Sequence, residues 1–436
     1  MNKAASTLMA TSTGALLAAT AYFLVWPSSL LPETDPSPIL ASTTPLPLSI
    51  YCSGPLALLG GADGTELGSL ELVGSATVLS HVGQGLEASG LTEQIESGQR
   101  ISLVSETQTT NALSAIQTQV VDLDRMAGLA ANYCAKPATQ GYFASGMAAV
   151  GDQSILHLAN PNNVEVQVTL NAISAAGESR ELVTLAADEQ IQISMAALAE
   201  GEPIFGLEYF SNGPSVSAAL QNRSVSGLAA TGLELVNATQ LATEVFIPGL
   251  EISEGSINAP RLRVLNPDTQ EITVRVTVHG MDVYSDVFEI TVPGRAIVEQ
   301  ELDLEPGDYL VELGSSGGFA ASIWNQKLGT SLDYAWLVPA ELFVDSVTLP
   351  VTGSELVVAN STDEPINVAV LSSGQYQSVT IASRSQYRLG VQGPDIRVQS
   401  DSGFLLALQL ENEFGYAAIS PTENLNLGSD LEIVVR

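Results

Sequence analysis

The sequence predicts an all-β protein made of tandem β-sandwich, immunoglobulin-like units that follow an N-terminal transmembrane helix and a proline-rich stalk. Three observations support this. An uncharged apolar run lies near the N-terminus, a strand–Asn–turn–strand pattern occurs three times, and long amphipathic helical patterns are scarce. The 436 residues are 45% hydrophobic and carry a formal net charge of −33. This composition excludes a disordered acidic tail and a nucleic-acid-binding protein, which needs clustered Lys and Arg.

The first element is a membrane segment at residues 1–26. From Leu8 to Trp26 the chain has no charged residue and no proline, and this run is close to the roughly 20 residues that span a bilayer as a helix. A cleaved signal peptide, with a site near Ala21, is the alternative. Lys3 on the short flank favours an N-terminus inside the cell. We therefore expect a single-pass protein of the cell membrane whose bulk is extracytoplasmic, or a cleaved and secreted protein.

A stalk and a disulfide follow the membrane segment. Residues 27–49 contain six prolines, which predict a semi-rigid, extended spacer. The chain has two cysteines, Cys52 and Cys134. Because both lie in the part predicted to be outside the cytoplasm and neither is left over, we expect them to form one disulfide.

The remainder of the chain is repetitive. Asn160, Asn266 and Asn360 each end a short apolar strand and precede a turn and an alternating strand. A later strand also recurs, at 112–118, 216–222, 319–325 and 404–410. The predicted domains are a truncated β unit with the disulfide at 50–150 and β-sandwich units at 151–250, 251–350 and 351–436. The pattern leaves open whether these units are separate or packed together.

The Cys-Ser-Gly-Pro sequence at Cys52–Pro55, the Cys134-x-x-Pro137 sequence and the Asn-Pro turns carry a family resemblance. With the N-terminal anchor, they resemble an actinobacterial family of membrane-anchored secreted envelope proteins classed as a domain of unknown function. The third copy departs from the pattern, since Ser361 stands where Pro is expected. The resemblance implies a surface location and a β architecture, and it brings no catalytic residues.

Candidate chemistry is sparse. The three histidines, His81, His157 and His279, form no HxH or HExxH motif. Acidic residues are densest at 122–124 and 301–308, but calcium needs six to eight oxygen ligands and usually a dedicated loop. We therefore predict no enzyme activity, no catalytic residues, no cofactor and no metal.

Three aromatic residues remain as a possible ligand contact. Trp324, Tyr334 and Trp336 would stack on a saccharide if exposed and would belong to the core if buried. The expected function is a non-enzymatic structural or interaction role in the bacterial cell envelope, with an envelope protein or cell-wall glycan as partner. A carbohydrate-binding cell-wall module, or an accessory subunit of an envelope glycosyltransferase or other membrane enzyme, is the alternative.

Overall fold

The computed structural model describes residues 39–42, 48–60, 68–84, 89–103, 111–256, 258–280, 285–328, 332–422, 425–426 and 430–433. The chain divides into two compact units, one of residues 1–45 with 428–436 and the other of residues 46–427. In the smaller unit, β1 (Ile39–Ser42) pairs antiparallel with β35 (Asp430–Ile433).

Nearly all of the described chain is β-strand, which confirms the all-β prediction; α2 (Ala196–Ala199) is the one helix in those residues. The predicted membrane segment, residues 1–26, lies outside the described residues. Within the described ranges no helix is long and apolar enough to cross a membrane.

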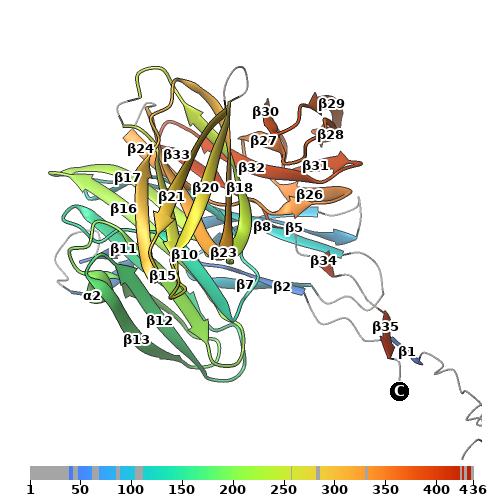
Figure 1. Cartoon of the computed structure of the whole chain (residues 1–436). Coiled ribbons are helices and arrows are strands. Elements are labelled where there is room, and N and C mark those ends of the chain that lie inside the picture. Colours follow the sequence, from blue (N-terminus) through green and yellow to red (C-terminus); the bar gives the residue numbers. More distant parts are fainter. Residues whose placement is uncertain are drawn as a thin grey trace, which may run out of the picture. The chain divides into compact units, whose positions relative to one another are not determined.

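The larger unit contains repeated β units, and the second of them, at residues 140–237, shows the pattern. One antiparallel sheet has the order β10-β15-β12-β13, and its four strands are labelled in Figure 1. The other has the order β14-β11-β16-β17. Its strands are β10 (Gln140–Gly146), β11 (Asp152–Ala159), β12 (Val166–Ser174), β13 (Gly177–Leu185), β14 (Gln190–Ser194), β15 (Phe205–Ser211), β16 (Ser217–Ser226) and β17 (Ala229–Asn237). The two sheets enclose one core to which both contribute apolar side chains.

The third unit, at 242–337, repeats this order as β18-β23-β20-β21 and β22-β19-β23-β24, because the long strand β23 takes part in both sheets. Its strands are β18 (Ala242–Ile252), β19 (Arg261–Asn266), β20 (Ile272–Gly280), β21 (Ser285–Val292), β22 (Ala296–Glu301), β23 (Gly307–Leu328) and β24 (Leu332–Leu337).

The fourth unit, at 346–419, has the sheets β26-β31-β28-β29 and β30-β27-β32-β33. Its strands are β26 (Ser346–Pro350), β27 (Ser354–Asn360), β28 (Ile366–Ser372), β29 (Gln375–Ile381), β30 (Ser385–Gly390), β31 (Asp395–Ser400), β32 (Phe404–Glu411) and β33 (Tyr416–Ile419). In each full unit the first strand precedes the repeated motif, so β10 lies in the range predicted for the preceding domain.

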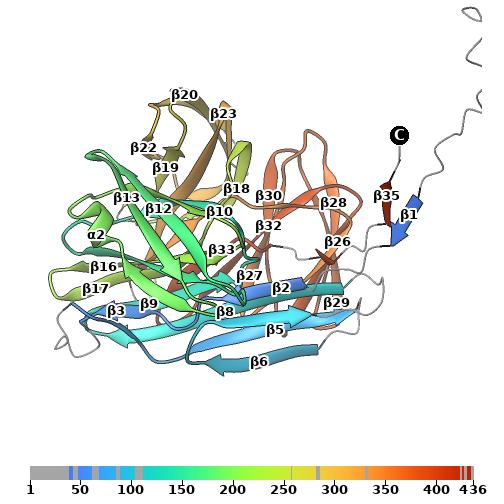
Figure 2. The same cartoon turned by 90° about the horizontal axis from the view of Figure 1, so that it is seen from below.

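The first unit, at 48–134, is reduced. It keeps one sheet in the order β6-β5-β8-β9, whose strands β5, β6 and β8 lie side by side in Figure 2, and the short pairs β2-β7 and β3-β4. Its strands are β2 (Leu48–Cys52), β3 (Ala57–Leu59), β4 (Leu70–Leu72), β5 (Ala76–Gln84), β6 (Ser89–Ile95), β7 (Gln99–Leu103), β8 (Asn111–Leu123) and β9 (Met126–Tyr133). The predicted Cys52–Cys134 disulfide is present and joins β2 to the residue after β9.

The strand order differs from the immunoglobulin arrangement that we expected. An immunoglobulin domain has the sheets ABED and CFG, in which the last two strands form a hairpin in one sheet with strand C. Here the last two strands, β16 and β17, also form a hairpin, but it pairs with β11, the second strand of the unit, and the first strand, β10, pairs with β15 in the other sheet. Alternation and turn spacing predict strands, but they do not determine which strands pair across the two sheets.

The repeated asparagine explains why the strand–turn–strand motif recurs. Asn266 is fully buried, and its side-chain Nδ2 donates to the carbonyl oxygens of Gln270 (2.7 Å), Val292 (3.2 Å) and Pro293 (3.1 Å). Its Oδ1 accepts from the Asp268 backbone N–H at 3.1 Å. Asn160 and Asn360 make the same four bonds. One side chain therefore fastens the turn to the end of the neighbouring hairpin, even in the copy that lacks the proline.

The four units form a closed ring, because the residues that follow the last strand of each unit, which after the second unit run directly into β18, pair with the next unit. Two of the pairing partners lie in β25 (Leu342–Phe343) and β34 (Leu425–Asn426). The four pairs are Ala138 with Val216, Ala242 with Phe319, Leu342 with Leu405, and Leu425 with Ala112. The last pair returns the chain to the first unit.

Further contacts close the ring between the fourth and first units. Ile116 and Leu129 of the first unit belong to the same apolar cluster as the core of the fourth unit. The Tyr133 hydroxyl donates to the Pro350 carbonyl at 3.1 Å. The units are thus packed together and not strung as separate beads.

Candidate functional site: the ring axis and its cavity

The last strands of the four units, β9, β17, β24 and β33, meet around one axis of the ring. Each lies at the edge of its sheet. Strand β17 lies against β9 and β24, and β33 lies against the same two strands on the other side. Edge strands present unpaired N–H and C=O groups, which would be costly to bury without partners.

One carboxylate satisfies an edge N–H from all four strands. Asp333 Oδ2 accepts from the backbone N–H groups of Leu129 and Tyr416, both at 3.0 Å. Its Oδ1 accepts from those of Leu233 and Tyr334, both at 2.9 Å. The Asp333 side chain is completely buried.

At the position of Asp333 along the axis there is room for only one side chain. Asp333 precedes Tyr334, and the residues that precede the other three donors are Gly128, Gly232 and Gly415. A Cβ on Gly128 would lie 2.8 Å from Asp333 Oδ2, and a Cβ on Gly415 would overlap the same oxygen. Equivalent positions of the four copies are therefore filled by one aspartate and three glycines.

A second carboxylate repeats the arrangement one layer along the axis. Glu234 Oε1 accepts from the backbone N–H of Leu235 at 2.9 Å and that of Ala131 at 3.4 Å, and Oε2 accepts from that of Ala418 at 3.4 Å. The equivalent residues of the other copies are Ala130, Ala335 and Ala417. Again one copy supplies the side chain and the other three make room for it.

Burial dominates the acidity of both groups. It raises the pKa of Asp333 to about 7, although the four N–H donors act in the opposite direction. It also raises the pKa of Glu234 well above its usual range. Because the carboxylate oxygens face backbone donors, the chemistry of this pair is to hold four sheet edges together.

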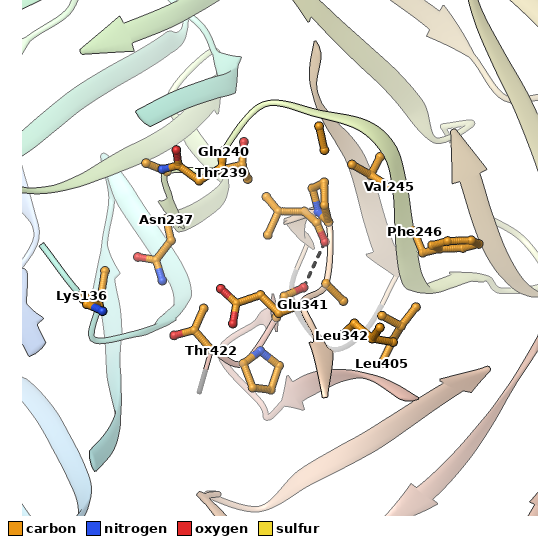
Figure 3. Close-up of a pocket in the computed structure, with 18 of the residues that line it drawn as sticks. Lys136, Asn237, Thr239, Gln240, Val245, Phe246, Glu341, Leu342, Leu405 and Thr422 are labelled. Atoms are coloured by element: carbon orange, nitrogen blue, oxygen red, sulfur yellow. Dashed lines mark hydrogen bonds between the residues drawn. The ribbon is translucent and has the colours of Figure 1, made fainter. Parts of the chain in front are cut away.

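A cavity of about 730 Å³ opens where the chain leaves the four edge strands. Each of the four outgoing segments contributes a polar residue to its wall: Lys136, Thr239, Glu341 and Thr422. Figure 3 shows the Glu341 carboxylate pointing into the cavity between Asn237 and Thr422. This volume lies in the range of about 300–1,000 Å³ that is typical of small-ligand sites.

The rest of the cavity wall is mostly small and apolar. Its apolar lining includes Ala135, Ala138, Ala238, Ala242, Val338, Pro339, Ala340 and Pro421. The Arg384 guanidinium lies 5.3 Å from the centre of the Phe246 ring and forms ion pairs with Glu312 and Asp363. Tyr209 also lines the wall, but it is only 2% exposed.

The three aromatic residues predicted as a possible ligand contact are core residues. Trp324 is 6% exposed, and Tyr334 and Trp336 are each 1% exposed. The guanidinium carbons of Arg261 and Arg263 lie 4.1 and 4.6 Å from the rings of Trp324 and Trp336. These side chains pack between units, since Met147 and Val236 of the second unit belong to the same cluster, and so they offer no exposed platform for a sugar.

The histidines are held apart by the fold. His157 is buried and its Nε2 lies 3.0 Å from Gln221 Oε1. His81 lies 3.5 Å from Asp395 across the junction of the first and fourth units, and His279 lies 2.8 Å from Glu312. No group of three potential metal ligands occurs among the described residues.

Sequence reasoning missed Asp333, Glu234 and the cavity. The sequence signal for the two carboxylates is weak, because Asp333 and Glu234 each replace a small residue at a single position of the repeat. Aligning the four last strands gives Gly, Gly, Asp and Gly at one position and Ala, Glu, Ala and Ala two residues later. An acidic residue among small ones on an apolar strand is the feature that points to the axis.

The chain belongs to a family of unknown function, DUF5719, whose match covers residues 91–392. No curated protein matches the sequence. Because the family supplies no activity, a functional role has to be inferred from the ring and its cavity.

Three solved structures are similar to this chain at low identity. One is a Ca²⁺-stabilised adhesin with which an Antarctic bacterium binds ice (11% identity, 83% of this chain and 91% of that chain, TM-score 0.11). The second is a tetra-tandem repeat in the extending region of a large adhesion protein (10%, 83% and 95%, TM-score 0.12). The third is an α-L-rhamnosidase of Streptomyces avermitilis (8%, 84% and 56%, TM-score 0.12). With such TM-scores, none of them carries an argument about this protein.

Proposed function

We propose that this protein is a non-enzymatic, membrane-anchored component of an actinobacterial cell envelope, which binds a partner through the cavity on its ring axis. Residues 1–26 would anchor it and residues 27–49 would hold the ring away from the membrane. Apart from this cavity, the surfaces at which the four units meet are occupied by contacts between the units themselves.

The extracytoplasmic location is supported by two observations. The run from Leu8 to Trp26 has the length and composition of a membrane anchor. The Cys52–Cys134 disulfide suits an oxidising compartment. A cysteine introduced at Tyr376, which is 75% exposed, should react with a membrane-impermeant maleimide in intact cells. Labelling only after lysis would contradict the proposed location.

The observation that carries the binding role is the convergence of four chain segments on one cavity. Residues 136, 239, 341 and 422 are far apart in sequence, yet all line the same space. The ring is needed to bring them together, because each comes from the exit of a different unit. A cavity built from several elements, with polar groups in a largely apolar wall, is typical of a binding site.

Photo-crosslinking in native membranes tests this role. A photoreactive amino acid at Leu342, which lines the cavity and is 58% exposed, should give a reproducible adduct identified by mass spectrometry. The same amino acid at Tyr376 on β29 is the control and should not give that adduct. Equal adducts at both positions, or none at Leu342, would contradict a role for the cavity.

The identity of the adduct separates the remaining alternatives. A membrane enzyme captured at Leu342 would make the protein an accessory subunit, for example of an envelope glycosyltransferase. A glycan captured there would make it a carbohydrate-binding cell-wall module. The burial of Trp324 and Trp336 gives that second alternative less support than the sequence did.

A further inference from the structure

We propose that the first unit of the ring binds an extended segment of another protein, which adds as an antiparallel strand to the free edge of β7. This site is separate from the axial cavity, whose lining includes no residue of β7. The three complete units show which strand covers the edge that the first unit leaves open.

The first unit lacks a hairpin that every complete unit has. In the complete units β15 lies between β10 and β12, β23 between β18 and β20, and β31 between β26 and β28. The equivalent strand of the first unit is β7, which pairs with β2 alone among the described strands; the two are labelled side by side in Figure 1. In the second unit β12 and β13 come between β11 and β14, whereas in the first unit β5 ends at Gln84 and β6 begins at Ser89. The interval is too short for the two missing strands.

The open edge of β7 carries backbone groups that a further strand could pair with. The N–H and C=O of Tyr51 in β2 bond to Ala135, so they point away from β7. Bonded and non-bonded pairs alternate along an antiparallel ladder. Because Arg100 is the partner of Tyr51, the N–H and C=O groups of Arg100 and Ser102 point away from β2. Both residues are exposed, and no hydrogen bond to another described residue uses these backbone groups. An edge of this kind is a template for strand addition.

The missing hairpin also leaves an apolar side chain uncovered on the inner face of the first unit. Leu91 of β6 lies on the same face as Ile95, because side chains alternate along a strand. Ile95 belongs to the core of this unit, whereas Leu91 is 62% exposed. In the second unit Ile193 of β14 packs against a core to which Val168 of β12 contributes. A strand added beside β7 would cover Leu91 in the same manner.

The charges beside the edge restrict which segment can bind. Glu93 is exposed on the inner face of β6 and accepts a hydrogen bond from Gln99 Nε2 at 3.3 Å, and Glu96 is exposed at the end of that strand. The Arg100 guanidinium is held by the second unit, since its Nη1 donates to the Pro161 carbonyl at 2.6 Å. An inward-pointing charge at an edge discourages pairing with arbitrary strands. We therefore expect a segment with Val or Ile at alternate positions and a positive net charge, which suits a chain of charge −33.

Fluorescence anisotropy with a labelled peptide and the full chain in detergent tests the inference. The probe is ITVRVTV, the sequence of Ile272–Val278 in β20, with both ends capped; in the third unit β20 fills the place that is open beside β7. Ser102→Pro removes an outward N–H but no bond of the β2-β7 ladder, and Pro is tolerated at such edge positions. It should weaken binding at least about tenfold, because a buried acceptor of the peptide loses its donor. Leu91→Asp should weaken binding by a similar factor, since it removes apolar contact. Ser102→Ala keeps the N–H and is the matched control, with an affinity within about twofold of wild type.

Backbone methylation of the probe separates strand addition from apolar adhesion. Two further peptides carry N-methyl groups on alternate residues, one peptide on each edge, and their side chains are unchanged. An added strand pairs with β7 through one of its edges only. One methylated peptide should therefore lose binding and the other should keep it.

Several results would overturn the inference. They are no binding up to about 1 mM, the weak end of specific association, equal binding of the two methylated peptides, or binding unchanged in both Ser102→Pro and Leu91→Asp. A dimer of the chain that dissociates in Ser102→Pro would make a second copy the occupant in place of another protein. An unchanged thermal midpoint shows that Ser102→Pro folds; if it does not fold, Leu91→Asp, at an exposed position, decides the test.

Discussion

The ring axis makes a prediction about moving a carboxylate from one unit to another. Asp333 stands where the other three copies have glycine, and it accepts four buried N–H groups. Because the four positions are equivalent around the axis, an aspartate supplied by another copy should accept the same four N–H groups. The test is the pair Asp333→Gly and Gly415→Asp, made singly and together.

The single variants should both be strongly destabilised. Asp333→Gly leaves four buried N–H groups without their acceptor, and at about 1–3 kcal/mol each the loss is at least about 4 kcal/mol. Gly415→Asp puts a second side chain where a Cβ alone would overlap the Asp333 carboxylate and would lie 2.5 Å from the Leu129 backbone nitrogen. Overpacking of this kind costs about 1–3 kcal/mol, and burying a second acidic group adds to that.

The double variant should recover most of the loss. It again places one carboxylate among the four N–H groups. The Cβ at position 415 still lies 2.5 Å from the Leu129 backbone nitrogen, which has to move, so we expect a free energy of unfolding within about 3 kcal/mol of wild type. The coupling between the two sites would then be favourable by at least about 3 kcal/mol. Urea denaturation, followed by the fluorescence of the buried tryptophans, measures the free energy of unfolding of each variant. Gly314→Asp is the control, because a Cβ at that position would have no atom within 4 Å. A double variant as unstable as the sum of the singles would refute the shared axis.

Three further predictions concern acidity, the repeated asparagine and the disulfide. Burial raises the pKa of Asp333 to about 7, so the folded protein keeps this proton at a pH where the unfolded chain has lost it. The part of the stability that depends on this bound proton is therefore complete below about pH 4 and is lost as pH rises to 7, on the order of 4 kcal/mol. Wild type should show this slope relative to Asp333→Gly in denaturation between pH 4 and 8, and parallel curves would contradict it. Asn266→Ala removes the four hydrogen bonds of a buried side chain and should lower the free energy of unfolding by about 2–4 kcal/mol. The control is Asn163→Ala, at an exposed residue beside an equivalent turn, which should change the free energy of unfolding by less than about 0.5 kcal/mol. Equal losses in the two variants would show that the side-chain bonds of Asn266 contribute nothing. Cys52→Ser with Cys134→Ser opens a link between residues 82 apart, which the chain-entropy model values at about 4 kcal/mol. The thermal midpoint should fall in the double serine variant and in reduced wild type alike, whereas an unchanged midpoint would mean that packing alone fixes this end of the ring.

Local features of the fold could be predicted from the sequence because they depend on neighbouring residues. The strand–turn–strand repeat around Asn160, Asn266 and Asn360 rests on bonds within the turn and on bonds to the end of the next hairpin, 21–27 residues later. The disulfide followed from the count of two cysteines. The scarcity of helix followed from the lack of apolar residues at helical spacing.

Features that depend on distant segments could not be predicted in the same way. Strand β16 pairs with β11, and β34 returns to pair with β8. The sequences of these strands do not indicate which strand each one pairs with. The same holds for Trp324 and Trp336, whose exposure is decided by a neighbouring unit. Asp333 is the clearest case, because its role requires four units to meet at one place.

Hydrogen exchange at four backbone amides tests the central claim that four units close around one axis. The donors to Asp333 are all leucine or tyrosine, namely Leu129, Leu233, Tyr334 and Tyr416, so ¹⁵N-Leu and ¹⁵N-Tyr labelling is expected to make them observable. A closed ring predicts that all four are strongly protected in wild type and that all four lose protection together in Asp333→Gly. Rapid exchange of any of them in wild type, or loss confined to Tyr334 in the variant, would show that the units do not share the axis.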